Sequence, residues 1–527
     1  MLSLAAASPL AAQDAATAGE EPQVAWPTLE PIARLRHEGA GRSAYDRASN
    51  MLFVVGDKGI AVIHMGRGDD AAIVRTINPA IESGVPEPEQ ATITSVVCDP
   101  RGRGVAMATV VPKDHALVPG RAIFFDTRTG KALANITVGY EPVYALWSFG
   151  GGSIHVANKG SAVKGRKDIA IDPPGTLSWI DVDELSNAAA FESLAQASVT
   201  IITPGGEALA SGLPALRITP ALRQSPDLDL EPTALAEAGN WLFVSFQANN
   251  AVGMFDLVNG VWRSILGLTP IEQRLDACAT DGPSVAHELA TLPMPNEIAV
   301  PILRDGDAYI VTANAGAIRG RMDRSSEAPY PDAAALMWMA KSKLIRDDLF
   351  PQHMLGYDGV GALEVCARSG DEDGDGVIER PCALGSRSLS LWNVTTGALV
   401  GDTGSAFEDA MTQSPRVYNT IGPRVDAAST ERGPEPSAMR VTKVGGVWYA
   451  FVGLAHPGAI AVVDLTDARA PKLVDLRVSA MEGDFGVPAL TLVPAAVNPT
   501  GSDLLIGSFA ASGTVEVWRI VPPVGSQ

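Results

Sequence analysis

The sequence predicts an all-β fold, a seven-bladed β-propeller with a partly helical insertion. Its 52 glycines and 38 prolines indicate many short strands and tight turns, because both residues punctuate strands and break helices. Seven stretches repeat one pattern of an apolar strand, a short polar turn and a second strand: 51–65, 104–133, 154–185, 241–262, 308–400, 448–474 and 503–521. Repeated hairpins without long helices between them favour a propeller over a sandwich, with one blade for each stretch.

The N-terminus predicts export. An Ala-rich apolar run from Leu2 to Ala12 ends in small residues and is typical of the end of a secretory signal, although the basic residues of a complete signal are missing. The alternative is an Ala-rich tail. We expect a signal-peptide remnant over residues 1–13, a flexible segment over 14–26 and a single propeller domain over 27–522. The expected location is secreted, either extracellular or periplasmic.

Charge and hydropathy exclude two classes of partner. The formal net charge of −20 repels phosphate backbones, so no nucleic acid is expected as a partner. The chain has no window of about 18 uninterrupted apolar residues, so no membrane span is expected.

An aspartate recurs near the ends of several predicted strands. Asp126, Asp181, Asp256 and Asp464 are each followed by residues typical of tight turns. A ring of ligands is one interpretation. The better one is that each side chain caps its own turn, as Asp commonly does.

The predicted insertion covers residues 319–387 and contains the one segment that reads as a helix. Strong helix formers fill residues 331–350, and Asp332 can serve as the N-cap. We expect this helix to cover one face of the propeller.

The same insertion contains a candidate calcium loop. Its pattern D-x-D-x-D-G-x-x-E offers four carboxylates and one backbone carbonyl, and Gly376 permits the sharp bend that lets them converge on a cation. It is not an EF-hand, because the twelfth position is a cysteine. The alternative is a solvated acidic loop. The expected Ca²⁺ ligands are Asp371, Asp373, Asp375, Val377 and Glu379, in a role that is structural and not catalytic.

Two cysteines flank this loop. A disulfide between Cys366 and Cys382 would close a loop of 15 residues and stabilise the fold by about 3 kcal/mol in the chain-entropy model. Export would favour it, because disulfides persist in oxidising compartments. Cys98 and Cys278 are either paired or free.

Several segments, in their order along the chain, resemble the choice-of-anchor I domain family. They include "PIARLRHEGAG", "GRAIFFDTRTGKAL", "TANAGAIRG", "GSRSLSLWNVTTGALV", "RGPEPSAMRV" and "YAFVGLAHPGAIAVVDLTD", and the likeness runs from about Pro31 to Ile520. The resemblance implies a seven-bladed extracellular propeller. In the family an acid occupies a turn of several blades, but here those turns hold Lys159, Ala248, Ala315, Ala455 and Ala510. Loss of these charges implies loss of any activity that depends on them.

Four polar residues remain at positions similar to the family pattern: Glu231, Arg319, Arg387 and Glu435. His37, followed by Glu38, is a further candidate for chemistry. We expect these six residues on the axial face. The chain has no G-x-S-x-G elbow, P-loop or H-E-x-x-H motif. The sequence therefore favours a calcium-stabilised, non-catalytic surface protein that binds an unknown extracellular ligand or protein. The alternative is a metal-dependent phosphoesterase or related hydrolase, in which Glu38, Glu231, Glu435 and His37 would converge. A weaker idea, implied by animal relatives, is calcium or mineral handling.

Overall fold

The structure is a computed structural model that describes residues 26–67, 70–165, 170–212, 216–219, 225–303, 306–322, 328–487 and 489–523. The expected signal remnant at residues 1–13 and almost all of the segment 14–26 lie outside these residues. The described part is built mainly of strands, with four short α-helices: α1 (Pro79–Glu82), α2 (Glu207–Gly212), α3 (Leu336–Lys341) and α4 (Ala406–Met411). No helix in this part is long and apolar enough to cross a bilayer.

Most of the described strands form seven four-stranded antiparallel sheets, taken here in chain order. The first holds β2 (Ser43–Asp46), β3 (Met51–Gly56), β4 (Gly59–His64) and β5 (Ala72–Ile77). The second holds β6 (Thr92–Cys98), β7 (Val105–Val111), β8 (Arg121–Asp126) and β9 (Ala132–Thr137). The third holds β10 (Pro142–Trp147), β11 (Ser153–Asn158), β14 (Thr176–Asp181) and β15 (Val199–Ile202). The fourth holds β16 (Ala234–Ala238), β17 (Trp241–Phe246), β18 (Ala251–Asp256) and β19 (Val261–Gly267).

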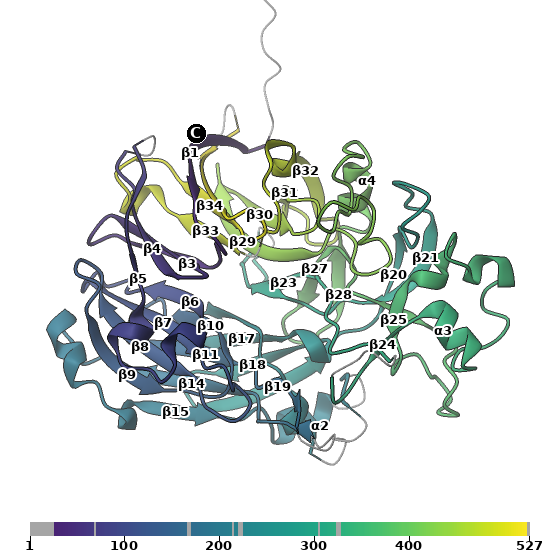
Figure 1. Cartoon of the computed structure of the whole chain (residues 1–527), viewed down its shortest axis with the longest axis horizontal. Helices are drawn as coiled ribbons and strands as arrows, with labels where there is room; N and C mark the ends of the chain where they lie inside the picture. The colour runs from purple at the N-terminus through teal and green to yellow at the C-terminus, as the bar shows by residue number, and fades with distance from the viewer. Residues whose placement is uncertain are drawn as a thin grey trace, which may run out of the picture.

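The remaining three sheets complete a ring (Figure 1). The fifth holds β22 (Glu297–Ala299), β23 (Tyr309–Ala313), β27 (Leu389–Asn393) and β28 (Leu399–Asp402). The sixth holds β29 (Pro436–Val444), β30 (Val447–Leu454), β31 (Ala459–Asp464) and β32 (Lys472–Arg477). The seventh joins β33 (Ala489–Val493), β34 (Leu504–Phe509) and β35 (Thr514–Val521) to β1 (Thr28–Arg36) from the start of the chain.

Contacts between the first strands close the ring. Each of β2, β6, β10, β16, β22 and β29 contacts the first strand of the next sheet, and β33 contacts both β29 and β2. Pairing of β1 with β35 in the register Thr28↔Val521 to Arg36↔Thr514 ties the two ends of the chain together. The predicted all-β propeller fold is confirmed.

The middle strands of each sheet are apolar because they are covered on both faces by neighbouring sheets. Residues 52–55 of β3 and 59–63 of β4 are all buried, so the two strands read as continuous apolar runs without alternation. An edge-to-face contact between Phe53 and Phe125, with ring centroids 5.6 Å apart, joins the first and second sheets. The core is therefore a circular series of layers between sheets.

Strands of the insertion and of the connection between the fourth and fifth sheets form a further sheet outside the ring. It contains β20 (Ile271–Leu275), β21 (His287–Leu292), β26 (Cys382–Leu384), β25 (Glu364–Cys366) and β24 (Ala333–Ala335), in that order across the sheet. Figure 1 shows these strands and α3 to one side of the ring. The prediction of a helix over residues 331–350 is wrong for most of its length. Pairing of β24 with β25 outweighs the local helix propensity of the alanines.

The strand-end aspartates confirm the turn interpretation. A carboxylate oxygen accepts a backbone N–H two residues ahead in each case, for example from Arg128 to Asp126 at 3.0 Å and from Thr466 to Asp464 at 2.7 Å. Asp181 and Asp256 do the same. These turns connect the third and fourth strands of their sheets. The opposite end carries the longer connections, including those from each sheet to the next, and we call it the loop end.

Candidate functional site

A pocket of about 190 Å³ opens at the loop end, between the third and fourth sheets and the insertion. It is lined on one side by the turn after β11 and by residues that flank the paired strands β12 (Val163–Lys164) and β13 (Ala170–Ile171). The other side is formed by the segment before β16, the turn after β17 and residues of the insertion. We call it the loop-end pocket, and its polar lining comprises Lys159, Ser161, Asp172, Asp229, Glu231, Gln247, Arg319 and Tyr330.

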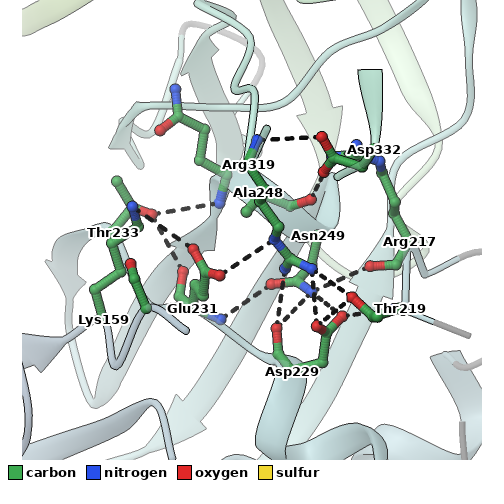
Figure 2. A network of polar contacts seen from close by, with 12 residues as sticks. Lys159, Arg217, Thr219, Asp229, Glu231, Thr233, Ala248, Asn249, Arg319 and Asp332 are labelled. Atoms are coloured by element: carbon green, nitrogen blue, oxygen red, sulfur yellow. Dashed lines mark hydrogen bonds and ion pairs between the residues drawn. The ribbon is translucent and has the colours of Figure 1, made fainter. Parts of the chain in front are cut away.

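Arg319 is the centre of the polar network beside this pocket (Figure 2). Its Nη1 donates to Asp229 Oδ1 at 2.8 Å and to Thr219 Oγ1 at 2.9 Å. Its Nη2 donates to the backbone carbonyl of Asp229 at 3.1 Å, and its Nε lies 3.1 Å from Glu231 Oε1. A guanidinium suits this position because its donors point in fixed, divergent directions. Arg319 thereby joins the insertion to the segment that precedes the fourth sheet.

A second arginine, Arg217, also belongs to the network. Arg217 pairs with Asp332 and donates to the backbone carbonyl of Ala248 at 2.8 Å. The Asn249 amide donates to the carbonyl of Asp229 at 2.8 Å, and Asn249 Oδ1 accepts the backbone N–H of Glu231 at 3.0 Å. Asp332 accepts the backbone N–H of Arg319 at 3.1 Å, so it is not the helix N-cap that the sequence predicts. The network fixes the backbone from which the pocket residues project.

Two buried oxygens that line the pocket lack a partner. Ser161 Oγ and Asp172 Oδ2 have no hydrogen bond to any described residue. Burial and, to a smaller extent, the nearby carboxylates of Asp229 and Glu231 raise the pKa of Asp172 to about 7, against the opposing charge of Arg319. Tyr330 lies near Asp172, and its pKa is raised chiefly by burial. An unpaired hydroxyl and an unpaired carboxyl are thus available to a bound molecule.

Lys159 is the most available cation of the pocket. Its Nζ lies 3.6 Å from Glu231 Oε2, longer than a hydrogen bond, and its side chain is 32% exposed. Lys159 and Ala248, two of the turn positions that differ from the family pattern, line this pocket, whereas Ala315 and Ala455 do not.

Of the six residues expected on an axial face, Glu231 and Arg319 lie together and the other four contact different partners. Arg387 is buried and pairs with Glu408 at 2.8 Å. Glu435 lies 2.8 Å from Arg432 and 3.0 Å from His456 Nε2.

His37 and Glu38 line a separate hollow of about 520 Å³. There Glu38 is exposed and pairs with Lys58 at 2.8 Å. His37 Nε2 has no hydrogen-bond partner among the described residues, and burial lowers the pKa of the imidazole.

A wider funnel of about 790 Å³ follows the axis of the ring and is lined by residues of all seven first strands. Its described lining includes none of the six predicted axial residues. Glu297 lies beneath it, almost completely buried, and pairs with Arg42 at 2.7 Å and with Arg440 at 3.1 Å. The Arg42 guanidinium also lies 4.1 Å from the centroid of the Tyr144 ring. No linear motif could reveal this cluster, because its members come from different sheets.

The acidic loop of the insertion folds back on itself through hydrogen bonds from its backbone to its own carboxylates. Asp371 accepts backbone N–H groups of Gly374 at 2.7 Å and Gly376 at 3.0 Å. Asp371, Asp373 and Glu379 each offer a carboxylate oxygen within 4.8 Å of the others, which fits the hard-oxygen preference of calcium. The Asp375 carboxylate accepts the backbone N–H of Val377 at 2.7 Å.

The cysteines of the insertion are free thiols in the structure, so the expected disulfide is not formed there. Both are buried, and the Arg217 Nε donates to Cys366 Sγ at 3.3 Å. Val365 pairs with Ala383 across the antiparallel strands β25 and β26, so Cys366 lies opposite Cys382. Cys98 and Cys278 are also free.

Comparison with known proteins gives one family match and several remote structural likenesses. The model of the choice-of-anchor I domain matches residues 42–468, whereas no curated protein matches the chain. Hydrazine synthase of Kuenenia stuttgartiensis is 10% identical, with a TM-score of 0.45 over 92% of this chain and 97% of that one. The β-propeller domain of Myceliophteria thermophila Cps50 (Swd1) is 8% identical, with a TM-score of 0.43 over 94% and 100%. The WD40 domain of Toxoplasma gondii coronin is 8% identical, with a TM-score of 0.43 over 96% and 90%.

Proposed function

Because the chain belongs to the choice-of-anchor I domain family, we propose that it is a secreted surface protein that binds an extracellular ligand at its loop-end pocket without catalysis. Its location would be extracellular or periplasmic. The family match supports a surface role, and the pocket chemistry supports binding.

The observation that carries this proposal is the pair of unpartnered buried oxygens, Ser161 Oγ and Asp172 Oδ2, in one pocket. A buried polar group without a hydrogen bond costs about 1–3 kcal/mol, and a polar ligand that pairs with both atoms would recover that cost. The Lys159 ammonium could bind an anionic or hydroxyl group of the same ligand. Arg319 and Asp229 already bond each other and serve to position the pocket.

The size of the pocket suggests what enters it. Sites for drug-sized ligands occupy about 300–1,000 Å³, whereas this pocket measures about 190 Å³. We infer that it accepts one polar unit of a larger surface partner, such as a sugar residue or a side chain.

The contacts around the pocket favour binding over hydrolysis. Its described lining contains neither histidine nor cysteine, and no base contacts the Ser161 hydroxyl. The hydrolase alternative requires Glu38, Glu231, Glu435 and His37 to converge, but Glu231 pairs with Arg319 while Glu435 pairs with Arg432 and His456.

Calcium and a disulfide would act on the insertion that forms one wall of this pocket. We propose that Asp371, Asp373, Asp375 and Glu379, with the carbonyl of Val377, hold a structural Ca²⁺. In an oxidising compartment Cys366 and Cys382, which lie opposite each other, would form a disulfide. Both would stiffen the segment that also carries Arg319.

A direct test is saturation-transfer NMR of the full chain against separate pools of monosaccharides, uronic acids and free amino acids. We expect transfer to at least one pool, lost in Lys159→Ala and in Asp172→Asn. Lys131→Ala is the matched control, because Lys131 is an exposed lysine of the second sheet that pairs with Glu192. Binding that survives in both pocket variants, or no binding to any pool, would overturn the proposal.

A further inference from the structure

A second acidic cluster joins two loop-end connections outside the loop-end pocket and the acidic loop. Asp276 and Asp281 lie in the connection between β19 and β22, and Asp426 lies in the connection between β28 and β29. One carboxylate oxygen of each lies within 4.8 Å of the other two. Asp276 and Asp426 are buried, whereas Asp281 is exposed.

The backbone holds Asp276 in a fixed orientation. Its Oδ1 accepts the N–H of Cys278 at 3.1 Å, and its Oδ2 accepts the N–H of Ser284 at 3.1 Å. Each oxygen retains one lone pair. Asp276 therefore has the preorganised geometry of a ligand and not that of a flexible surface acid.

One buried carboxylate oxygen in this cluster lacks a partner. Asp426 is 4% exposed, and its Oδ1 accepts the Ser429 hydroxyl while its Oδ2 has no hydrogen bond to a described residue. Tyr418 is 0% exposed, and its phenol lies beside the Asp276 carboxylate. An unsatisfied buried oxygen such as Asp426 Oδ2 points to a bound group.

The charges around the cluster do not balance. Arg387 is the nearby cation, and its Nη1 already donates to Glu408 Oε1 at 2.8 Å and to the backbone carbonyl of Asp276 at 2.7 Å. The three aspartates of the cluster have no ion pair to a described lysine, arginine or histidine. Buried carboxylates must be paired, protonated or bound to a metal.

We propose that Asp276, Asp281 and Asp426 bind a divalent cation of the calcium class. Oxygen ligands alone suit calcium, which takes six to eight of them and tolerates irregular geometry. The exposed position of Asp281 leaves one side of the cluster open to water, which supplies the remaining ligands. The cation links the connection between the fourth and fifth sheets to the connection between the fifth and sixth.

Counting bound ions tests the proposal. Chelator-treated full-length protein is dialysed against ⁴⁵Ca²⁺, and the ions per chain are counted for the wild type, Asp426→Asn, Asp373→Asn and the double variant. Asp426 has φ = 66°, a left-handed conformation that asparagine tolerates well, so the substitution keeps the backbone. Asp126→Asn, in a turn at the opposite end of the ring, is the matched control.

We expect Asp426→Asn to bind one ion fewer than the wild type, and the double variant one fewer than Asp373→Asn. The comparison holds whether or not the acidic loop binds calcium. Equal numbers of ions in the wild type and in folded Asp426→Asn would overturn the proposal and leave Asp276 and Asp426 as a pair that shares a proton.

Terbium gives a second readout that reports distance. Tb³⁺ at this cluster would be excited through the neighbouring Tyr418 phenol. We expect Tyr418→Phe to reduce the tyrosine-excited emission per bound ion, with the ions counted in the same sample. Unchanged emission in this variant would place the cation elsewhere.

Discussion

Arg319 Nε lies 3.1 Å from Glu231 Oε1, and its Nη1 simultaneously reaches Asp229 Oδ1 at 2.8 Å. One guanidinium thus holds two acids of the loop-end pocket and fixes their separation. A lysine at this position would keep the charge but could not reach both acids, because its donors diverge from a single nitrogen.

The substitution Arg319→Lys should therefore lower the free energy of unfolding by about 2 kcal/mol, the value of one or two charged hydrogen bonds. It should also speed hydrogen exchange over residues 225–231. Urea unfolding and exchange mass spectrometry check the two effects. Arg346→Lys, in an exposed pair with Asp348, should change the free energy by less than about 1 kcal/mol. Equal effects of the two substitutions would contradict a special role for Arg319.

Glu297 beneath the axial funnel neutralises two arginines from other sheets. Its carboxylate pairs with Arg42 at 2.7 Å and with Arg440 at 3.1 Å. Removal of one partner of a buried ion pair costs about 3–5 kcal/mol, because it leaves a buried charge uncompensated. Glu297→Ala should destabilise the ring by that amount in urea unfolding. The exposed control Glu192→Ala, which loses its pair with Lys131, should cost about 0–1 kcal/mol.

Local signals predicted the ring and its turns, because both depend on residues that are near in sequence. Apolar runs such as residues 51–65 form adjacent strands, and Asp126 caps the turn that immediately follows it. The helix prediction over residues 331–350 failed where tertiary pairing intervened. Residues 333–335 join a sheet with residues 364–366, and no local propensity contains that information.

The candidate site was only partly predictable for the same reason. The resemblance to the family singles out Glu231 and Arg319, and these two residues do lie together. Asp172 gave no linear signal, because it meets Glu231 only when the third and fourth sheets pack side by side. The cluster of Glu297 with Arg42 and Arg440 likewise exists only after the ring has closed.

Glu516 should make stability fall as pH rises. Burial on β35, together with the charges of Asp484 and Glu482, raises its pKa to about 7, against the opposing charges of Arg477 and Arg34. Between its ordinary value of 4.5 and about 7, the folded state binds more protons than the unfolded state, so the free energy of unfolding decreases with pH across this window. Above about pH 7, Glu516 is charged in both the folded and the unfolded state, and the full cost of burying this charge lowers the free energy of unfolding.

Melting curves at about pH 5 and about pH 8 test this effect. The drop in Tm between them should be smaller for Glu516→Gln than for the wild type, because glutamine removes this group's share of the pH dependence. Glu192→Gln, at an exposed position, should leave the drop unchanged. An identical drop in Glu516→Gln and the wild type would contradict the raised pKa.

Calcium should order the acidic loop locally. Asp371, Asp373 and Glu379 repel one another without a cation, and binding to the folded state alone stabilises it by about 2.7 kcal/mol at a hundredfold excess over Kd. Hydrogen exchange over residues 370–380 should slow in calcium relative to chelator, and Asp373→Ala should abolish the change. Because the readout is confined to the loop, a second cation elsewhere would not obscure it. An unchanged exchange rate in the wild type would leave the loop as solvated surface.

The thiols Cys366 and Cys382 lie opposite each other on paired strands, so oxidation on export should join them without a change of fold. Burial raises the pKa of Cys382 to about 12, which protects the free thiol from alkylation in the native state, so labelling must follow unfolding.

Exported protein that is denatured without reductant should take up label at two of its four cysteines. Cys366→Ser should then take up label at three and lose about 3 kcal/mol of stability, because the cross-link no longer restricts the unfolded chain. Four labelled cysteines in the wild type would show that the pair stays reduced, and the acidic loop would then depend on calcium alone for its order.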